Sequence, residues 1–85
     1  MEEQEVGKIT HYYNHLGVAA LTVTQGELKV GDTIHIRGAH SDFTQKLESI
    51  QIEHGNVESA KVGDDIGIKV IEHAREHDTV YKVVE

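Results

Sequence analysis

The sequence predicts an all-β domain, built as a small closed antiparallel β-barrel of about six strands. Apolar and polar residues alternate in short runs, as in Ile34-His35-Ile36-Arg37, which is typical of strands with one buried face. No stretch repeats apolar residues at helical spacing over three turns, so no long amphipathic helix is expected. Glycines separate the apolar runs at positions 26, 31, 38, 55 and 63, where we expect turns that need positive φ.

Six short segments rich in β-branched residues account for most of the chain. The second of them places Ala19, Leu21 and Val23 on one face, and the last places Tyr81 and Val83 on one face. In order, the expected strands cover residues 6–13, 18–24, 33–37, 42–54, 66–70 and 79–84.

The longest segment, residues 42–54, contains an irregularity that predicts a bend. Phe43 and Leu47 share one parity, whereas Ile50 and Ile52 share the other, so a regular strand would expose half of them to water. A β-bulge or a sharp bend near position 48 would bring all four side chains to the same face. Bends of this kind allow a small sheet to close, and this observation is the basis for expecting a closed barrel.

The turn before the third strand is expected to be structural. Leu28 and Val30 are positioned to plug one end of the barrel, and Gly31 is expected to adopt a backbone conformation that a β-branched residue cannot reach. Residues 70–77 are crowded with charged and imidazole side chains and are expected to form a solvated loop or a single turn. The acidic residues 1–5 are expected to be frayed, and residues 6–85 to form one domain.

Composition limits the classes of function. The chain has 85 residues and a formal net charge of -7, and its eight basic residues never cluster, so the field of the whole domain disfavours nucleic acid and anionic membranes. There is no cysteine, and we identify neither a basic, apolar leader nor a long apolar run. We therefore expect a cytoplasmic domain that does not enter a membrane.

Metal binding and catalysis are not expected. His73 and His77 have the i, i+4 spacing of a helical zinc pair, but their segment is a poor helix candidate and no thiolate ligand accompanies them. None of the three serines lies in a Gly-x-Ser-x-Gly motif, and no cofactor is predicted. Four histidines at outward or turn positions are expected to tune surface charge between about pH 5 and 8: His11, His35, His40 and His54.

Three motifs resemble the second, β-barrel domain of translational GTPases such as elongation factor Tu. They are Gly-Glu-Leu-Lys-Val-Gly-Asp-Thr-Ile-His-Ile at residues 26–36, Leu-Glu-Ser-Ile at 47–50 and Gly-Asp-Asp-Ile-Gly-Ile at 63–68. Their order and spacing agree with that domain, and the resemblance covers residues 6–83. The ending at residues 78–83 is also similar to the C-terminal barrel of collagenase-like peptidases.

The resemblance implies a fold of the translation-protein type and suggests where ligands would bind. In the elongation factor, the loop before the second strand and the turn before the fifth line the pocket for the 3′ end of aminoacyl-tRNA. The matching candidates here are Asn14, His15, Asp64 and Asp65, which include no arginine. The phosphate-binding loop Gly-x-x-x-x-Gly-Lys-Ser/Thr of the GTPases is absent, so GTP hydrolysis is not expected. Four motif residues are expected to shape turns: Gly26, Gly31, Asp32 and Gly63.

These observations lead to one expected function and one alternative. The first is a non-catalytic adaptor, a free-standing barrel that docks onto a larger protein such as a translation factor, a peptidase-like or RNA-modifying enzyme, or onto a ribonucleoprotein. The alternative is direct binding of the tRNA acceptor end or of other structured RNA, which the charge of the chain does not favour. The identity of the partner and the oligomeric state stay open at this point.

Overall fold

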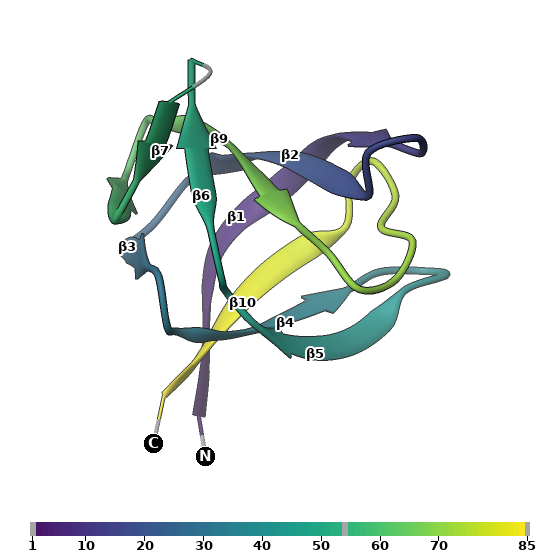
Figure 1. The fold of residues 1–85 in the computed structure, drawn as a ribbon. Coiled ribbons are helices and arrows are strands. Elements are labelled where there is room, and N and C mark those ends of the chain that lie inside the picture. Colours follow the sequence, from purple (N-terminus) through teal and green to yellow (C-terminus); the bar gives the residue numbers. More distant parts are fainter. Residues whose placement is uncertain (1, 54, 85) are drawn as a thin grey trace.

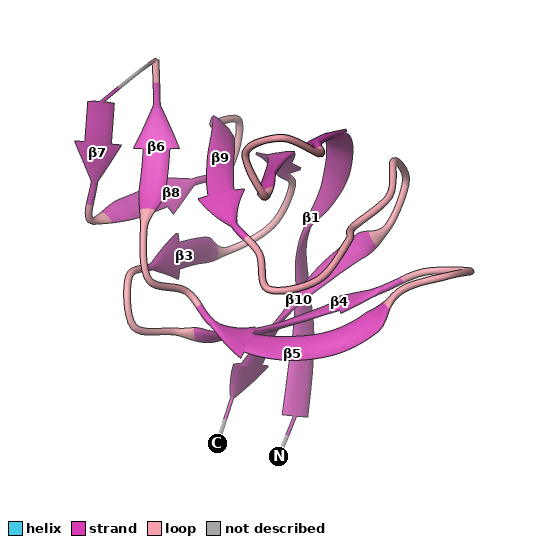
Figure 2. Ribbon diagram, turned by 45° about the vertical axis from the view of Figure 1, so that its right-hand side comes forward, coloured by secondary structure: helices cyan, strands magenta, loops and turns pink. Residues whose placement is uncertain are grey.

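The computed structural model describes residues 2–53 and 55–84, which form ten strands and, within those residues, no helix (Figures 1 and 2). The strands are β1 (Glu2–Tyr13), β2 (Val18–Val23), β3 (Glu27–Lys29), β4 (Thr33–Arg37), β5 (Asp42–Lys46), β6 (Ile50–Ile52), β7 (Gly55–Val57), β8 (Ser59–Lys61), β9 (Asp65–Lys69) and β10 (Thr79–Val84). The prediction of an all-β domain is therefore confirmed.

Eight of the strands form one curled antiparallel sheet in the order β5-β4-β10-β1-β2-β9-β6-β7, and β3 pairs with β8 in a second, two-stranded sheet. Figure 2 shows how the large sheet bends round a common interior. Its order begins at β5 and ends at β7, and no ladder in the described part of the chain joins these two strands. The sequence predicted a closed ring of strands, and the structure does not confirm closure.

The acidic N-terminus is part of the sheet. Residues 1–5 are expected from their charge to be frayed, whereas the structure places Glu2–Glu5 in β1, where Glu2 faces Val84 and Glu5 faces Tyr81 on β10. Backbone hydrogen bonding to β10 does not depend on side-chain charge, and the glutamates remain exposed or half-buried on the outside. Met1 lies outside the described residues. The two ends of the chain therefore run side by side (Figure 1).

The predicted bend in residues 42–54 is confirmed. β5 ends at Lys46 and β6 begins at Ile50, and the residues between them belong to no strand. The bend lets Phe43, Leu47 and Ile50 all point inward, although a regular strand would separate them by parity. The structure does not describe His54 at the end of this segment.

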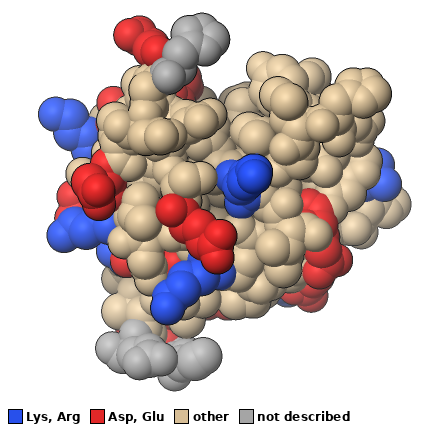
Figure 3. Space-filling model, viewed as in Figure 1, with Lys and Arg blue, Asp and Glu red and all other residues tan. Residues whose placement is uncertain are grey.

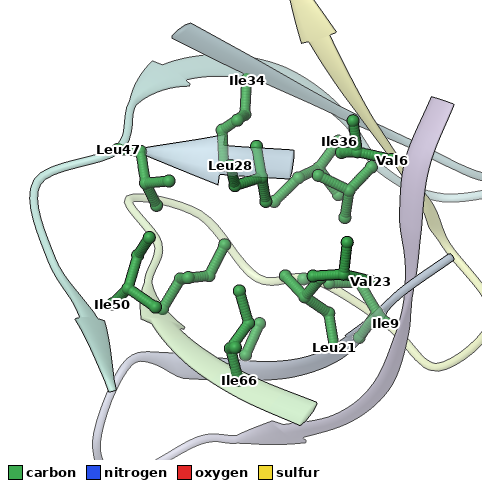
Figure 4. Close-up of a cluster of buried hydrophobic side chains, with 14 of the residues drawn as sticks. Val6, Ile9, Leu21, Val23, Leu28, Ile34, Ile36, Leu47, Ile50 and Ile66 are labelled. Atoms are coloured by element: carbon green, nitrogen blue, oxygen red, sulfur yellow. The ribbon is translucent and has the colours of Figure 1, made fainter. Parts of the chain in front are cut away.

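The interior of the curled sheet is filled by aliphatic side chains that meet from opposite walls (Figure 4). Leu28, from the small β3–β8 sheet, is fully buried among them, as predicted. Val30 was expected to plug the same end but is 39% exposed, because the turn that follows β3 carries it outward. On β10 the residue that enters the core is Val80, which lies on the face opposite Tyr81 and Val83.

Two turns with the same sequence, Lys-Val-Gly-Asp at residues 29–32 and 61–64, have the same geometry. In each turn the aspartate side chain accepts a hydrogen bond from the backbone N–H of the lysine, at 2.9 Å for Asp32 and 3.0 Å for Asp64. In each, the glycine N–H and the aspartate C=O also form hydrogen bonds with one distant residue, which is Leu47, just after β5, for the first turn and Val23, the last residue of β2, for the second. Gly31 has φ of 101° and Gly63 has φ of 94°, so both need the left-handed conformation that glycine adopts readily.

The likeness of the two turns extends into the strands around them. β3 pairs with β8, and the ladder between β4 and β5 matches the ladder between β9 and β2. For example, His35 faces Thr44 on the first ladder just as Gly67 faces Ala20 on the second. We refer to this arrangement, which relates β2, β3 and β4 to β5, β8 and β9, as the internal repeat.

Substitution of Gly31 by valine is expected to lower the free energy of unfolding by about 1–3 kcal/mol, because a β-branched residue is strained at this φ. An added Cβ at this position would meet no atom within 4 Å, so the cost is conformational rather than steric. Gly63→Val has the same surroundings and is expected to cost a similar amount. Urea denaturation of both variants tests this, and an unchanged midpoint would show that the turns are not strained.

Positive φ was expected at five turn glycines, and the structure bears this out at Gly26, Gly31 and Gly63 but not at Gly38 and Gly55. Gly55 lies in β7 rather than in a turn. Gly38 is needed for a different reason, since a Cβ there would overlap the carboxylate of Asp78. Asp78 is nearly fully buried and accepts a 2.9 Å hydrogen bond from the N–H of Arg75, at the end of the irregular segment 70–78. That segment was expected to be a loop or single turn, and it contains no helix.

Candidate binding surface

The four residues that the sequence suggested for ligand binding do not come together. Asn14 and His15 are exposed in the turn between β1 and β2. Asp64 and Asp65 lie at the opposite end of the β2–β9 ladder, since Asp65 faces Thr22 whereas Val18, next to the first turn, faces Lys69. The two predicted loops are thus separated by the length of this ladder.

Asp64 and Asp65 already have hydrogen-bond partners inside the domain. Asp64 shapes the second Lys-Val-Gly-Asp turn through its bond to Lys61, a role that the sequence analysis assigned only to Asp32. Asp65 Oδ1 accepts a hydrogen bond from Thr22 Oγ1 at 2.6 Å across the ladder. The predicted turn residues Gly26, Gly31, Asp32 and Gly63 lie in turns or in the connections between strands.

A groove of about 330 Å³ lies between the two predicted loops, on the outer face of β2 and β9. Its floor contains Ala20 and Gly67, which face each other on the ladder, and Gln51 of β6 lies on the other side of Gly67. We call this hollow the β2–β9 groove; it is lined by Tyr13, Leu16, Val18, Ala20, Gln51, Glu53, Asp65, Ile66 and Gly67. A second hollow of about 270 Å³ shares Val18, Gln51 and Gly67 with it and adds Lys69, so the two hollows adjoin.

Large apolar side chains are exposed in the two loops that adjoin the Val18–Lys69 end of the β2–β9 ladder. Leu16, in the turn before β2, is 65% exposed, and Ile71, in the loop after β9, is 70% exposed. A 3.0 Å hydrogen bond from Val70 N to Gly17 O joins the two loops. The loop at Ile71 is also held by the side chain of Gln45, which accepts from Ile71 N at 2.8 Å and donates to Lys69 O at 2.7 Å. We call Leu16 and Ile71 the apolar rim.

The view in Figure 3 shows that residues other than Lys, Arg, Asp and Glu cover the upper right of the molecule, over β2 and the turn that precedes it. The carboxylates of Glu53 and Asp65 lie at one end of the β2–β9 groove, and neither forms an ion pair within the described residues. Lys69 lies toward the opposite end of the ladder, in the adjoining hollow. The groove is therefore apolar on its floor and negative at one end.

His35 is the histidine with the strongest contacts in the described residues. It faces away from the core, as predicted, but it is largely covered. Its Nε2 lies 2.5 Å from Asp42 Oδ1 and its Nδ1 lies 2.7 Å from Glu3 Oε2, so strands β4, β5 and β1 meet at one ring. The hydrogen bond to Asp42 and the contacts with Glu3 raise the pKa of His35 above its ordinary value, while partial burial opposes this shift.

Stability is expected to fall as the pH rises through the raised pKa of His35. A group whose pKa is higher in the folded than in the unfolded protein stabilises the fold fully below the unfolded value, near pH 6.5, and loses this effect above the folded value. Melting temperatures measured from pH 5.5 to 9 should therefore decline more steeply for the wild-type chain than for His35→Gln. Parallel curves for the two proteins would contradict the prediction.

Among the residues that the structure describes, the other histidines do not converge on a common site. The segment that carries His73 and His77 is not helical, so their spacing does not place both rings on one helix face; the ring of His73 instead stacks on Tyr12, with centroids 4.3 Å apart. His11 and His40 are exposed, as expected. In residues 2–53 and 55–84 no group of three or more metal-binding side chains is arranged to hold an ion, nor is there a helix of the length and hydropathy that crossing a bilayer requires.

The curated relatives that this chain matches are named as peptidases, and the chain matches one part of each. The chain is 37% identical over 82 residues to an uncharacterized protease of Methanocaldococcus jannaschii, and 41% identical over 78 residues to a collagenase of Porphyromonas gingivalis. These matches cover 95% and 91% of the chain but only 20% and 22% of the two relatives. The chain thus spans about a fifth of the length of the curated relatives that it matches.

Solved structures agree on the fold. Two crystal structures of the C-terminal domain of a putative U32 peptidase from Geobacillus thermoleovorans superimpose with TM-scores of 0.85 and 0.86 at 20% and 22% sequence identity. The matches cover 91% and 93% of this chain, and 96% and 91% of those domains. The model of the family described as elongation factor Tu domain 2 matches residues 17–77. The chain therefore belongs to the elongation factor Tu domain 2 family.

Proposed function

We propose that this chain is a non-catalytic docking module that binds the body of a collagenase-type peptidase. The observation that carries the proposal is the apolar rim, since Leu16 and Ile71 are mostly exposed although hydrogen bonds fix the loops that hold them. Covering both side chains would remove apolar surface from water, worth roughly 1–3 kcal/mol for each. An ordered apolar rim beside a groove is typical of a surface that another protein covers.

The relatives support a peptidase as the partner. They are named as a protease and a collagenase, and they are about five times longer than the segment that this chain matches, so the related segment occurs with a much larger body. We also propose a cytoplasmic location for this interaction, with which a chain without cysteine agrees.

Binding of RNA is the competing outcome. The residues that match the tRNA pocket of the elongation factor lie at opposite ends of a ladder, and two of them are carboxylates that would repel phosphate. The net charge of -7 opposes RNA in the same way. Protein docking and RNA binding differ in their response to salt, because only RNA binding releases many condensed counterions.

The test is titration calorimetry of this chain against the Porphyromonas gingivalis collagenase from which the matching segment has been removed. We expect binding that changes by less than about threefold between 50 and 200 mM salt. The double variant Leu16→Ser/Ile71→Ser should weaken it by at least tenfold. The matched control is Val30→Ser/Val62→Ser, which alters two other exposed apolar residues and should bind like the wild type.

Three results would contradict the proposal. They are no binding to the collagenase body, equal binding by the rim variant and the wild type, or binding of a tRNA probe that falls steeply with salt when the collagenase does not bind.

A further inference from the structure

We infer that the β2–β9 groove binds an extended polypeptide segment that places a lysine or arginine side chain against Asp65 and Glu53. The inference rests on the proposed docking function and specifies what enters the site. It starts from a glycine that the fold does not require, and it is completed by the shape and charge of the groove.

Gly67 lies in the middle of β9, and its φ is not in the positive range that favours glycine. A Cβ at this position would lie 3.5 Å from Val18 Cγ1, which is an ordinary contact. Gly7 of β1 is different, because a Cβ there would approach the carbonyl oxygen of Thr22 to 2.4 Å. The packing of the fold therefore requires a glycine at position 7 but not at position 67. A glycine inside a strand nevertheless costs roughly 0.5–1 kcal/mol of stability relative to alanine.

The internal repeat shows that a large side chain fits at the equivalent strand position. The counterpart of Gly67 is His35, whose ring stands on the outer face of β4 between Glu3 and Asp42. In one half of the repeat an imidazole thus occupies this position on the outer face. In the other half the space over Ala20 and Gly67 is open. A missing side chain inside a strand often marks the close approach of another backbone.

The walls of the groove suit an extended polypeptide chain better than they suit a flat protein surface. On β1, Tyr13 lines the groove beside Val18, and its ring is held by an edge-to-face contact with His11, whose ring centroid lies 4.5 Å away. On the other side, Gln51 donates a 3.4 Å hydrogen bond to Asn56 of β7. A polypeptide segment can lie between these walls and reach the floor.

The charges give the segment a preferred composition. From Asp65 to Lys69 the strand spans about 13 Å, which is the length of four residues of extended chain. Asp65 Oδ1 accepts from Thr22 Oγ1, which is a neutral donor, and no basic side chain within residues 2–53 and 55–84 forms an ion pair with this carboxylate. Glu53 adds a second negative charge at the same end. A cationic side chain is therefore favoured at this end, and a phosphate is disfavoured.

The experiment is an NMR titration of the ¹⁵N-labelled chain with the tetrapeptide acetyl-Arg-Ala-Leu-Ala-amide, and with acetyl-Glu-Ala-Leu-Ala-amide as the probe of opposite charge. The arginine probe should shift the amide signals of Ala20, Thr22 and Gly67 and should bind at least fivefold more tightly than the glutamate probe. Asp65→Asn/Glu53→Gln should remove this preference, whereas Glu72→Gln, which changes an exposed carboxylate outside the groove, should retain it.

Gly67→Val tests the groove directly by filling its floor. It should weaken binding of the arginine probe at least tenfold with an otherwise unchanged spectrum; if the valine variant does not fold, Gly67→Ala is used with the same expectation at about threefold. Equal affinity of either folded variant and the wild type, or signal shifts confined to other strands, would overturn the inference.

The same Gly67 variant, titrated against the truncated collagenase, separates the two proposals. Weakened binding supports both. Unchanged binding, together with a loss in the Leu16→Ser/Ile71→Ser variant, overturns the groove and leaves the docking function standing. If neither variant weakens binding to the collagenase, both proposals are contradicted.

Discussion

Replacement of Leu47 by alanine is expected to lower the free energy of unfolding by about 2–5 kcal/mol. Leu47 is fully buried at the bend between β5 and β6, where no strand ladder holds the chain. Its side chain points into the core (Figure 4), and its backbone N–H and C=O each form a 2.8 Å hydrogen bond with the first Lys-Val-Gly-Asp turn. A cavity left by the smaller side chain would weaken the packing at the bend between β5 and β6.

Leu16→Ala is the matched control, because it removes the same atoms from a side chain that is 65% exposed. It should change the free energy of unfolding by less than about 0.5 kcal/mol. Urea denaturation of both variants measures the two losses in free energy of unfolding. The comparison requires that this free energy fall with urea concentration at the same slope for both variants. A similar, small loss for Leu47 would mean that the bend is not packed as described.

Replacement of Gly38 by alanine is the second large effect, with an expected loss of about 1–3 kcal/mol or more. The new Cβ would meet Asp78 Oδ1 at 1.9 Å, and this carboxylate cannot move away freely because it is buried and bonded to Arg75 N. Chemical denaturation measures the loss. Gly55→Ala is the control, since its Cβ would make only an ordinary 3.5 Å contact with Ile52 O.

The pairing of Gly38 with Asp78 can be checked by a double-mutant cycle. Asp78→Ala alone should destabilise the fold through the lost bond to Arg75, and the two changes together should cost at least 0.5 kcal/mol less than their sum. Strict additivity would show that the carboxylate does not limit the space at Gly38.

The hydrophobic periodicity of the sequence predicted those features of the fold that depend only on residues close together in the chain. The alternation at Ile34 and Ile36 and the parity change between Leu47 and Ile50 were sufficient to predict strands and a bend. The strand assignment of Glu2–Glu5 was missed because their charge says nothing about backbone pairing with β10. Closure was inferred from the bend alone, but a bend does not decide whether the outermost strands pair.

Features that depend on contacts between distant parts of the chain could not be predicted from this periodicity. The β2–β9 groove depends on Ala20, Gly67 and Gln51 lying side by side, and only the strand register brings them together. The approach of Gly38 to Asp78 is likewise a tertiary contact. The repeated Lys-Val-Gly-Asp is visible in the sequence, and it indicates for Asp64 the same turn-shaping hydrogen bond that Asp32 forms.

The internal repeat has a consequence for how such a domain arises. Each turn bonds a strand end that belongs to the other half, Leu47 in one case and Val23 in the other, so neither half is complete without its counterpart. Reciprocal exchange of this kind is what two copies of a peptide about twenty to thirty residues long would form about a two-fold axis, as a homodimer. Fusion of two such copies into one gene would let each half change separately, and the two halves of this chain differ at the equivalent strand position, which holds His35 in one and Gly67 in the other.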